Sequence, residues 1–412
     1  MKVRIVLLVV LVLALGLAFG GGLLSLAQGQ CQSWDKVLDL PTSPYYINPY
    51  YFRSCQPTQD GGYLLLGTKA LFKPGEYYYD AVLLIKLDAQ GNTEWDKTFI
   101  PTHIKDGEEE YLSSGSFSIQ QTEDGGYIVL GYVDHGNPSV DEVWLIKTDA
   151  HGNKLWDKTF DGGWGCSIQQ TSDGGYILLG YTGSYGAGDY HYGDLWLVKT
   201  DDQGNVEWDR TFNKRADWHD VYWGKLPLRQ TGDGGYIFLA PHWLIKTDAQ
   251  GNSEWEREVG LDISDVQCTE DGGYVLLMHS GGGLNEFAYL EKRDGQGNVQ
   301  WSKRIRVPYT PVWALLVAMQ QTPDGGYIML GGITTYLYRY PNYGDYEYKQ
   351  DVWLVKTDAR GNTQWEKTFD KDNNDFGLFL QIASDGGYLL FCRTEPEPNF
   401  ASSRWWLIKY CP

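Results

Sequence analysis

The sequence predicts an all-β protein: a seven-bladed β-propeller of four-stranded antiparallel blades, with the ring closed by an N-terminal outer strand in the last blade. Three short strings that recur along the chain carry this prediction, because repeats of this length are typical of propellers and other arrays. The string Asp-Gly-Gly-Tyr begins at Asp60, Asp124, Asp173, Asp233, Asp271, Asp324 and Asp385. A Gly-Asn pair precedes Trp95, Trp156, Trp208, Trp255, Trp301 and Trp365. An apolar run ends at Lys86, Lys147, Lys199, Lys246, Lys292, Lys356 and Lys409.

Each repeat reads as four short strands. In the second repeat we expect them at 116–122, 127–132, 143–149 and 154–160. The glycines of Asp124-Gly125-Gly126 supply the positive φ that a tight hairpin needs. A unit of this size cannot bury both of its faces alone, whereas units stacked around an axis can. The competing architecture is a β-solenoid, whose repeats are usually shorter and whose strands are parallel.

The last repeat lacks a fourth strand. Residues 378–384, 388–393 and 404–410 supply three strands, and the run around Trp34 resembles the outer strand of the other repeats. We therefore expect the N-terminal strand to complete the last blade, which leaves no free sheet edge.

The cysteines are consistent with this closure. Cys31 and Cys411 align with the two sides of a hairpin loop that the last blade lacks, and we predict a disulfide between them. The other four cysteines are expected to be small buried hydrophobic residues. A Cys55–Cys392 bridge between neighbouring blades stays open as an alternative.

The N-terminus indicates export. Residues 1–27 are predicted to be a signal peptide and residues 28–412 a single propeller domain. Lys2 and Arg4 precede an apolar stretch, and small residues up to Ala27 suit signal peptidase. The alternative is an uncleaved membrane anchor. The expected location is secreted or extracytoplasmic.

The charge of the chain excludes some partners. Without Lys2 and Arg4, 32 basic residues stand against 53 acidic ones, a net charge of −21. Such a chain repels nucleic acid and anionic membranes, so we expect no nucleic-acid partner and no membrane insertion after signal removal. We expect a monomer that meets a polysaccharide or protein ligand.

The run 86–95 resembles the tryptophan-docking motif of the quinoprotein-like (PQQ-like) propeller superfamily. It departs by one residue. Gly91 stands three residues after Asp88, at the position where the family motif has a Thr before its Gly. The Asp-Gly-Gly-Tyr strings also resemble the repeats of exported prokaryotic propeller proteins. The resemblance implies the fold and no particular activity. We expect no cofactor beyond a possible calcium ion.

Connectivity divides the loops between two faces. The turns between strands one and two and between strands three and four of each repeat share one face and are nearly identical in sequence. The remaining connections share the other face and vary, so we expect a binding site there. Aromatic rings among Asp and Gly suit sugar or peptide binding, and the alternative is that they pack the loops onto the ring. The expected ligand-binding residues are Tyr77, Tyr79, Tyr190, Tyr192, Trp218, Trp223, Tyr336, Tyr340, Tyr346 and Tyr348.

One stretch resembles a calcium loop. Asp370, Asp372 and Asn374 place oxygen ligands at alternate positions, although the glycine and glutamate of an EF-hand are missing, which favours a plain polar turn. The chain has no nucleophile elbow, zinc-protease motif or phosphate loop. Two carboxylates of a glycosidase on separate loops would leave no signature.

The expected function is a secreted or cell-surface binding or scaffold protein with a tyrosine-rich binding face. The alternatives are a propeller enzyme that acts on a polysaccharide (a glycoside hydrolase or lyase) and an envelope assembly scaffold. No catalytic residue is expected. The repeated lysines are interpreted as surface or turn-pairing charges.

Overall fold

The computed structural model describes residues 31–38, 50–71, 79–105, 108–135, 142–161, 163–182, 191–217, 226–240, 242–280, 287–307, 313–339, 346–372, 374–395 and 404–412. The predicted signal peptide, residues 1–27, lies outside these ranges. The described residues form thirty β-strands and no helix. Within them, no helix is long and apolar enough to span a membrane.

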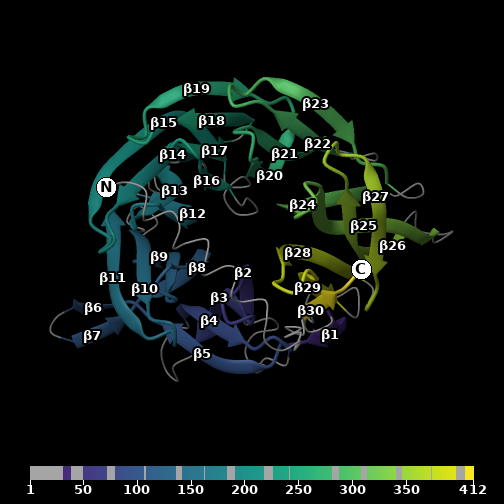
Figure 1. Cartoon of the computed structure of the whole chain (residues 1–412). Helices are drawn as coiled ribbons and strands as arrows, with labels where there is room; N and C mark the ends of the chain where they lie inside the picture. The colour runs from purple at the N-terminus through teal and green to yellow at the C-terminus, as the bar shows by residue number, and fades with distance from the viewer. Residues whose placement is uncertain are drawn as a thin grey trace, which may run out of the picture.

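Strands that follow one another in the chain pair antiparallel in sheets arranged around a common axis (Figure 1). Five sheets have four strands each. The first is β2 (Tyr50–Pro57), β3 (Tyr63–Leu71), β4 (Tyr79–Leu87) and β5 (Thr93–Phe99). The second is β8 (Ser113–Gln121), β9 (Tyr127–Asp134), β10 (Glu142–Thr148) and β11 (Lys154–Asp161). The third is β12 (Gly163–Gln170), β13 (Tyr176–Thr182), β14 (His191–Thr200) and β15 (Val206–Asp217).

The fourth sheet is β16 (Leu228–Gln230), β17 (Tyr236–Ala240), β18 (Trp243–Thr247) and β19 (Ser253–Glu258). The fifth is β20 (Asp262–Cys268), β21 (Tyr274–His279), β22 (Ala288–Arg293) and β23 (Val299–Arg304). A separate hairpin of β6 (Thr102–Lys105) and β7 (Glu108–Tyr111) projects between the first two sheets (Figure 1). The second sheet matches the four strands predicted for that repeat to within three residues at each end.

The remaining strands form one eight-stranded sheet with two antiparallel halves. One half is β24 (Trp313–Gln321), β25 (Tyr327–Arg339), β26 (Tyr346–Thr357) and β27 (Thr363–Phe369). The other half, which we call the terminal unit, is β28 (Asn374–Ile382), β29 (Tyr388–Glu395), β30 (Arg404–Tyr410) and β1 (Trp34–Val37). A single parallel pairing, Gln350 with Asn374, joins the halves.

Both ends of the chain meet in the terminal unit. Strand β1 pairs antiparallel with β30, with Trp34 opposite Lys409 and Val37 opposite Trp406. The predicted disulfide between Cys31 and Cys411 is present, with Cα atoms 5.7 Å apart. It stands beside the two paired strands, where the other units have a hairpin loop.

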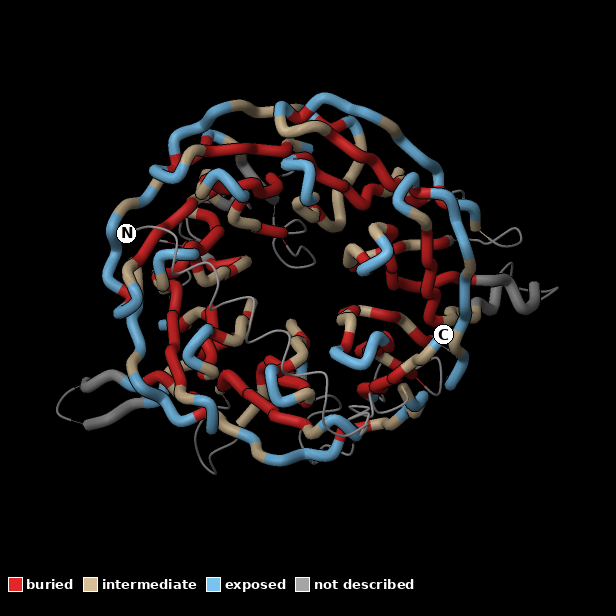
Figure 2. The backbone as a smooth tube through the Cα atoms, in the orientation of Figure 1, coloured by how far each residue is buried: buried red, intermediate tan, exposed pale blue. Residues whose placement is uncertain are grey.

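The core lies between neighbouring units. The second and third strands of each unit are apolar on both faces and almost fully buried, while the fourth strand forms an exposed outer rim (Figure 2). One cluster joins Phe52 and Leu65 of the first sheet to Phe391 and Trp405 of the terminal unit. Its rings are in contact, with centroids of Phe52 and Trp405 5.0 Å apart. Burial between units is what a four-stranded sheet with two apolar faces requires.

The repeated tryptophans dock onto the next unit. Gly152, in the turn between β10 and β11, has a φ of +74°, and a Cβ there would lie 2.7 Å from the ring of Trp95 on β5. The same contact joins Trp34 to Gly91. Only glycine combines the positive φ with room for the ring. The repeated Gly-Asn-x-x-Trp string is therefore a connector between units, and Trp34 takes the place predicted for it.

The repeated lysines are buried, so the prediction that they are surface charges is wrong. The alternative prediction, that they pair with the turns, is confirmed. Lys147 is 4% exposed, and its ammonium donates to the Asp124 carboxylate at 2.9 Å and to the Thr148 carbonyl at 2.9 Å. Asp124 also accepts from the Gly126 amide. Each Asp-Gly-Gly turn is thus held by a lysine of its own unit.

Candidate functional site

The candidate site lies on the face opposite the Asp-Gly-Gly turns, where the connections vary. Of the predicted aromatic ligand residues, Tyr77, Tyr190, Trp218, Trp223 and Tyr340 lie outside the described residues. The backbones of Tyr192, Tyr336, Tyr346 and Tyr348 belong to strands β14, β25 and β26. Tyr79 begins β4 and has a described side chain.

Tyr79 stacks on a tyrosine that the sequence analysis did not single out. Its ring lies 5.5 Å from that of Tyr111, at an interplanar angle of 27°. Tyr111 is 46% exposed and ends the β6–β7 hairpin, and Tyr51 at the start of β2 is 56% exposed. The only signal for Tyr111 is its place just before an innermost strand, on the variable face. These rings leave apolar surface open to solvent on this face.

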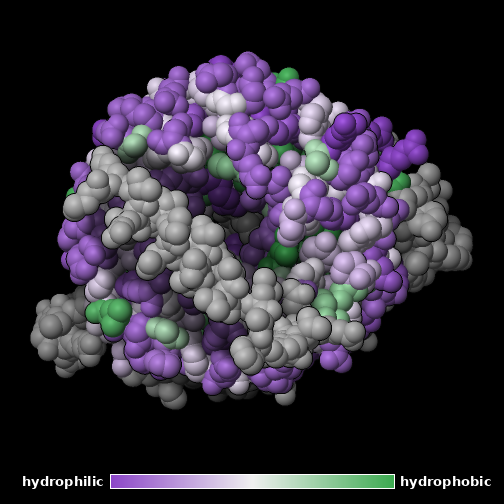
Figure 3. All heavy atoms as spheres, viewed as in Figure 1, coloured by the Kyte–Doolittle hydropathy of each residue, from purple (hydrophilic) through white to green (hydrophobic). Residues whose placement is uncertain are grey.

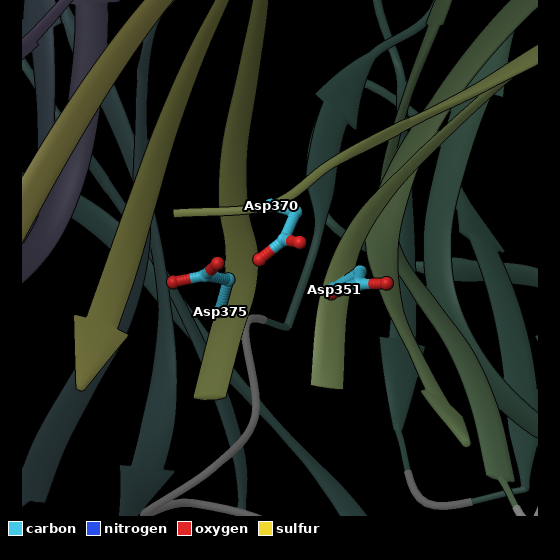
Figure 4. A group of neighbouring side chains, drawn as sticks. All are labelled: Asp351, Asp370 and Asp375. Atoms are coloured by element: carbon cyan, nitrogen blue, oxygen red, sulfur yellow. The ribbon is translucent and has the colours of Figure 1, made fainter. Parts of the chain in front are cut away.

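Three carboxyl groups meet where the two halves of the large sheet join. Asp351 lies on β26, Asp370 follows β27, and Asp375 is the second residue of β28. One carboxylate oxygen of each lies within 4.8 Å of the others. Figure 4 shows the Asp370 carboxyl group between those of Asp351 and Asp375.

The three differ in exposure and in partners. Asp375 is fully buried; its Oδ2 accepts from the Lys371 amide at 2.6 Å, whereas its Oδ1 accepts no hydrogen bond from any described residue. The side chain of Asp351 is 20% exposed, and its Oδ1 accepts no hydrogen bond either, although the Lys349 ammonium lies 3.6 Å away. Lys349 donates to Asp370. Burial raises the pKa of Asp351 and of Asp375.

This cluster contains Asp370, one of the predicted calcium ligands, and two carboxylates that were not predicted as ligands: Asp375, five residues later in the same stretch, and Asp351. The carboxylate of Asp372 accepts from Thr394 at 2.9 Å and from Arg404 at 3.0 Å. The backbone of Asn374 pairs with Gln350 and Glu395. The contribution of Asp351 was missed because it is 19 residues from Asp370 in sequence. Connectivity was the available signal, since the start of a third strand shares a face with the connection to the next unit.

Histidines also gather with a carboxylate, which their scattered positions did not predict. The imidazoles of His242 and His279 lie 3.7 and 4.0 Å from the two oxygens of Asp262. His279 also lies 3.0 Å from the Ser264 hydroxyl. His242 has a φ of +61°, so its turn holds it in a conformation that non-glycine residues rarely adopt. These side chains form a polar group on the variable face, at distances longer than a hydrogen bond between Asp262 and either ring.

The remaining cysteines match their predicted role in burial. Cys55, Cys166 and Cys392 are buried and Cys268 is half-buried; all four are thiols. Burial raises the pKa of the Cys166 thiol to about 12, which keeps it protonated and unreactive. The alternative Cys55–Cys392 bridge is absent from the described residues.

Comparisons with known proteins bear on the fold. No protein-family model matches the chain, and no curated protein matches it in sequence. The WD40 domain of Pan2 from Neurospora crassa is 10% identical, with a TM-score of 0.52 over 92% of this chain and 94% of that one. A protein of unknown function from Bacteroides caccae is 10% identical, with a TM-score of 0.42 over 75% of this chain and 94% of that one. The likeness to the WD40 domain, together with the repeated four-stranded sheets, shows a β-propeller fold.

Proposed function

We propose that this chain is an exported, seven-bladed propeller that binds a polysaccharide or protein ligand through the aromatic residues of its variable face. The single observation that carries the proposal is the pair of stacked rings, half-buried Tyr79 and exposed Tyr111. Stacked tyrosines present flat apolar surface and hydroxyl groups together, which suits a sugar ring or a peptide.

The blade count rests on treating the eight-stranded sheet as two blades. Among the described residues, the backbone pairing between its halves is limited to Gln350 with Asn374, and each half repeats the four-stranded order of the other sheets. Five sheets and two halves make seven blades. Closure is supported by the pairing of β1 with β30 and by the Gln381 amide, which donates to the Cys55 carbonyl at 3.3 Å across the seam.

Separate observations support export and the proposed superfamily. A disulfide between residues that are 380 positions apart suits an oxidising compartment. The described residues on the side of the molecule drawn in Figure 3 are largely hydrophilic, which suits a surface exposed to water. Six tryptophans lie against the glycine turn of the next unit: Trp34, Trp95, Trp156, Trp208, Trp255 and Trp301. Such docking is what the quinoprotein-like motif predicts, and we propose that superfamily as the relative.

The alternative of a polysaccharide-acting enzyme needs an accessible pair of carboxylates. Within the residues that the structure describes, the group of three carboxylates around Asp370 includes the fully buried Asp375, which a saccharide cannot reach. The geometry therefore favours binding over hydrolysis. An envelope assembly scaffold would use the same face for a protein partner.

The test is a glycan array probed with the purified protein, alongside Tyr79→Ala/Tyr111→Ala and a second variant with Tyr190, Tyr192, Tyr340 and Tyr346 changed to Ala. We expect saturable binding to one class of glycan that both variants lose, with little change in melting temperature. The matched control is Leu155→Ala, which removes an exposed apolar side chain from the outer strand β11. Loss of thermal stability in the variants would show instead that the rings pack the loops. Retained binding in both variants would place the site elsewhere.

A further inference from the structure

We propose that Asp351, Asp370 and Asp375 bind one calcium ion, which joins β26 to β28 where the two halves of the large sheet meet. This site does not depend on the proposed ligand-binding role of the aromatic residues. Its ligands come from a strand of one half, the connecting segment and the first strand of the terminal unit.

The cluster and its one neighbouring ammonium group carry a net charge of −2 when all three carboxyl groups are ionised. Three carboxylates face one ammonium group, that of Lys349, which pairs with Asp370 and lies 3.6 Å from Asp351. The nearby acidic groups have partners of their own: Asp372 pairs with Arg404, Asp35 with Lys371, and Glu395 with Arg393. A divalent cation would bring the cluster to neutrality.

The second observation is the Oδ1 atom of Asp375. It is buried on a residue with no exposed surface, accepts no hydrogen bond from the part of the chain that the structure describes, and belongs to a carboxylate that lies in the cluster. An unpaired buried carboxylate oxygen is costly, and buried charges in proteins are normally paired or bound to a metal. The other oxygen of Asp375 is already used, because it accepts from the amides of Lys371 and Asp372 and so shapes the loop that carries Asp370.

The donor set selects the ion. All three ligands are carboxylates, the hard oxygen donors that calcium and magnesium prefer over softer metals. They come from three separate segments and differ widely in exposure, from fully buried Asp375 to the largely exposed Asp370. Calcium accepts the irregular geometry that such a set offers, whereas magnesium demands a near-octahedral one.

The site has a structural consequence. The direct backbone pairing between the two halves is limited to Gln350 with Asn374, and these residues are the immediate neighbours of Asp351 and Asp375. A cation at the cluster would link the side chains of Asp351 and Asp375 across this junction. Calcium would therefore stabilise the seam between the β24–β27 half and the terminal unit.

The test is calorimetric titration of the chelator-treated protein with calcium chloride, combined with thermal unfolding with and without calcium. We expect one site with a Kd of about 0.1–1 mM, the range of extracellular calcium modules. At 10 mM calcium the melting temperature should rise by roughly 2–4 °C. Asp375→Asn and Asp351→Asn should each weaken binding at least tenfold and lose the rise.

Two comparisons separate binding from folding. In chelator, Asp375→Asn should melt at or above the wild-type temperature, because the amide removes an unpaired buried charge. Asp372→Asn is the matched control, since its carboxylate serves Thr394 and Arg404, and it should keep calcium binding within about threefold. The proposal fails if no saturable binding occurs up to 10 mM calcium, if magnesium binds and calcium does not, or if Asp372→Asn loses binding while Asp351→Asn keeps it.

Discussion

The two faces of the propeller are built by different rules. On one face, every unit carries an Asp-Gly-Gly turn, and every unit except the terminal one also carries a Gly-Asn turn. In each turn an aspartate accepts from a turn amide, and a lysine or a tryptophan packs against the turn. On the other face, connections of differing length carry the stacked Tyr79 and Tyr111 and the carboxylates around Asp370. The residues of the first face are constrained by the contacts that hold the fold together. The residues of the second face are not repeated, and the proposed ligand and cation sites lie there.

Repetition on the first face has a physical cause. A turn that receives a tryptophan from the preceding unit needs a positive φ and no Cβ, so glycine recurs there in every unit except the terminal one. The connections of the variable face receive no repeated tryptophan. Their side chains make contacts that occur at one place in the ring, such as that of Lys349 with Asp370.

The largest expected effect contrasts glycines on the two faces. Gly152→Ala would place a Cβ at positive φ and 2.7 Å from the Trp95 ring, so we expect a loss of about 3–4 kcal/mol in the free energy of unfolding. Gly174→Ala shares the positive φ in open space and should lose about 1 kcal/mol. Gly260→Ala, on the variable face with open space and no positive φ, should change stability by less than about 0.5 kcal/mol. Denaturant unfolding measures all three, and equal losses at Gly152 and Gly174 would refute the docking contact.

The disulfide should have the next largest effect. The terminal unit lacks one of the two repeated turns and has the Cys31–Cys411 bond beside its outer strands instead. Changing both cysteines to Ser should lower the free energy of unfolding by about 2–4 kcal/mol, because the bond constrains the unfolded chain and holds β1 against β30. Reductant should lower the melting temperature of the wild type to that of the double variant and leave the variant unchanged. A wild type that is insensitive to reductant would show that β1 needs no covalent tie.

The smallest effect is acid sensitivity of the repeated turns. Hydrogen bonds from Lys356 and Thr322 lower the pKa of Asp324 to about 2, and those from Lys292 and Thr269 lower the pKa of Asp271 to about 2. A pKa lower in the folded state than in the unfolded state adds stability above pH 4, which is lost as pH falls toward 2.

Measuring the free energy of unfolding between pH 5 and pH 2 tests this directly. The Asp324→Asn variant should be less stable than the wild type at pH 5, and the gap should close by pH 2. A gap that stays constant over this range would mean that the Asp324 carboxylate contributes no pH-dependent stability.

Much of the first face could be predicted from the sequence. The hairpins at Asp124 and Gly152 follow from local residue types, and the pairing of Trp34 with the last repeat follows from counting strands. The predicted disulfide followed from the same alignment. The depth at which Lys147 lies did not follow, because burial depends on the neighbouring strands rather than on the motif.

What the sequence determined by itself is the repeating unit, its turns and the partnership of the two termini, because these depend on contacts within a repeat or on its regular spacing. The tertiary structure alone decided which side chains of different units meet on the variable face. Asp351 and Asp375 come together because one unit lies beside the start of the next. In the same way, His242 of the fourth sheet lies near Asp262 at the start of the fifth. Such contacts form once per molecule between residues that share no motif, so neither composition nor periodicity encodes them.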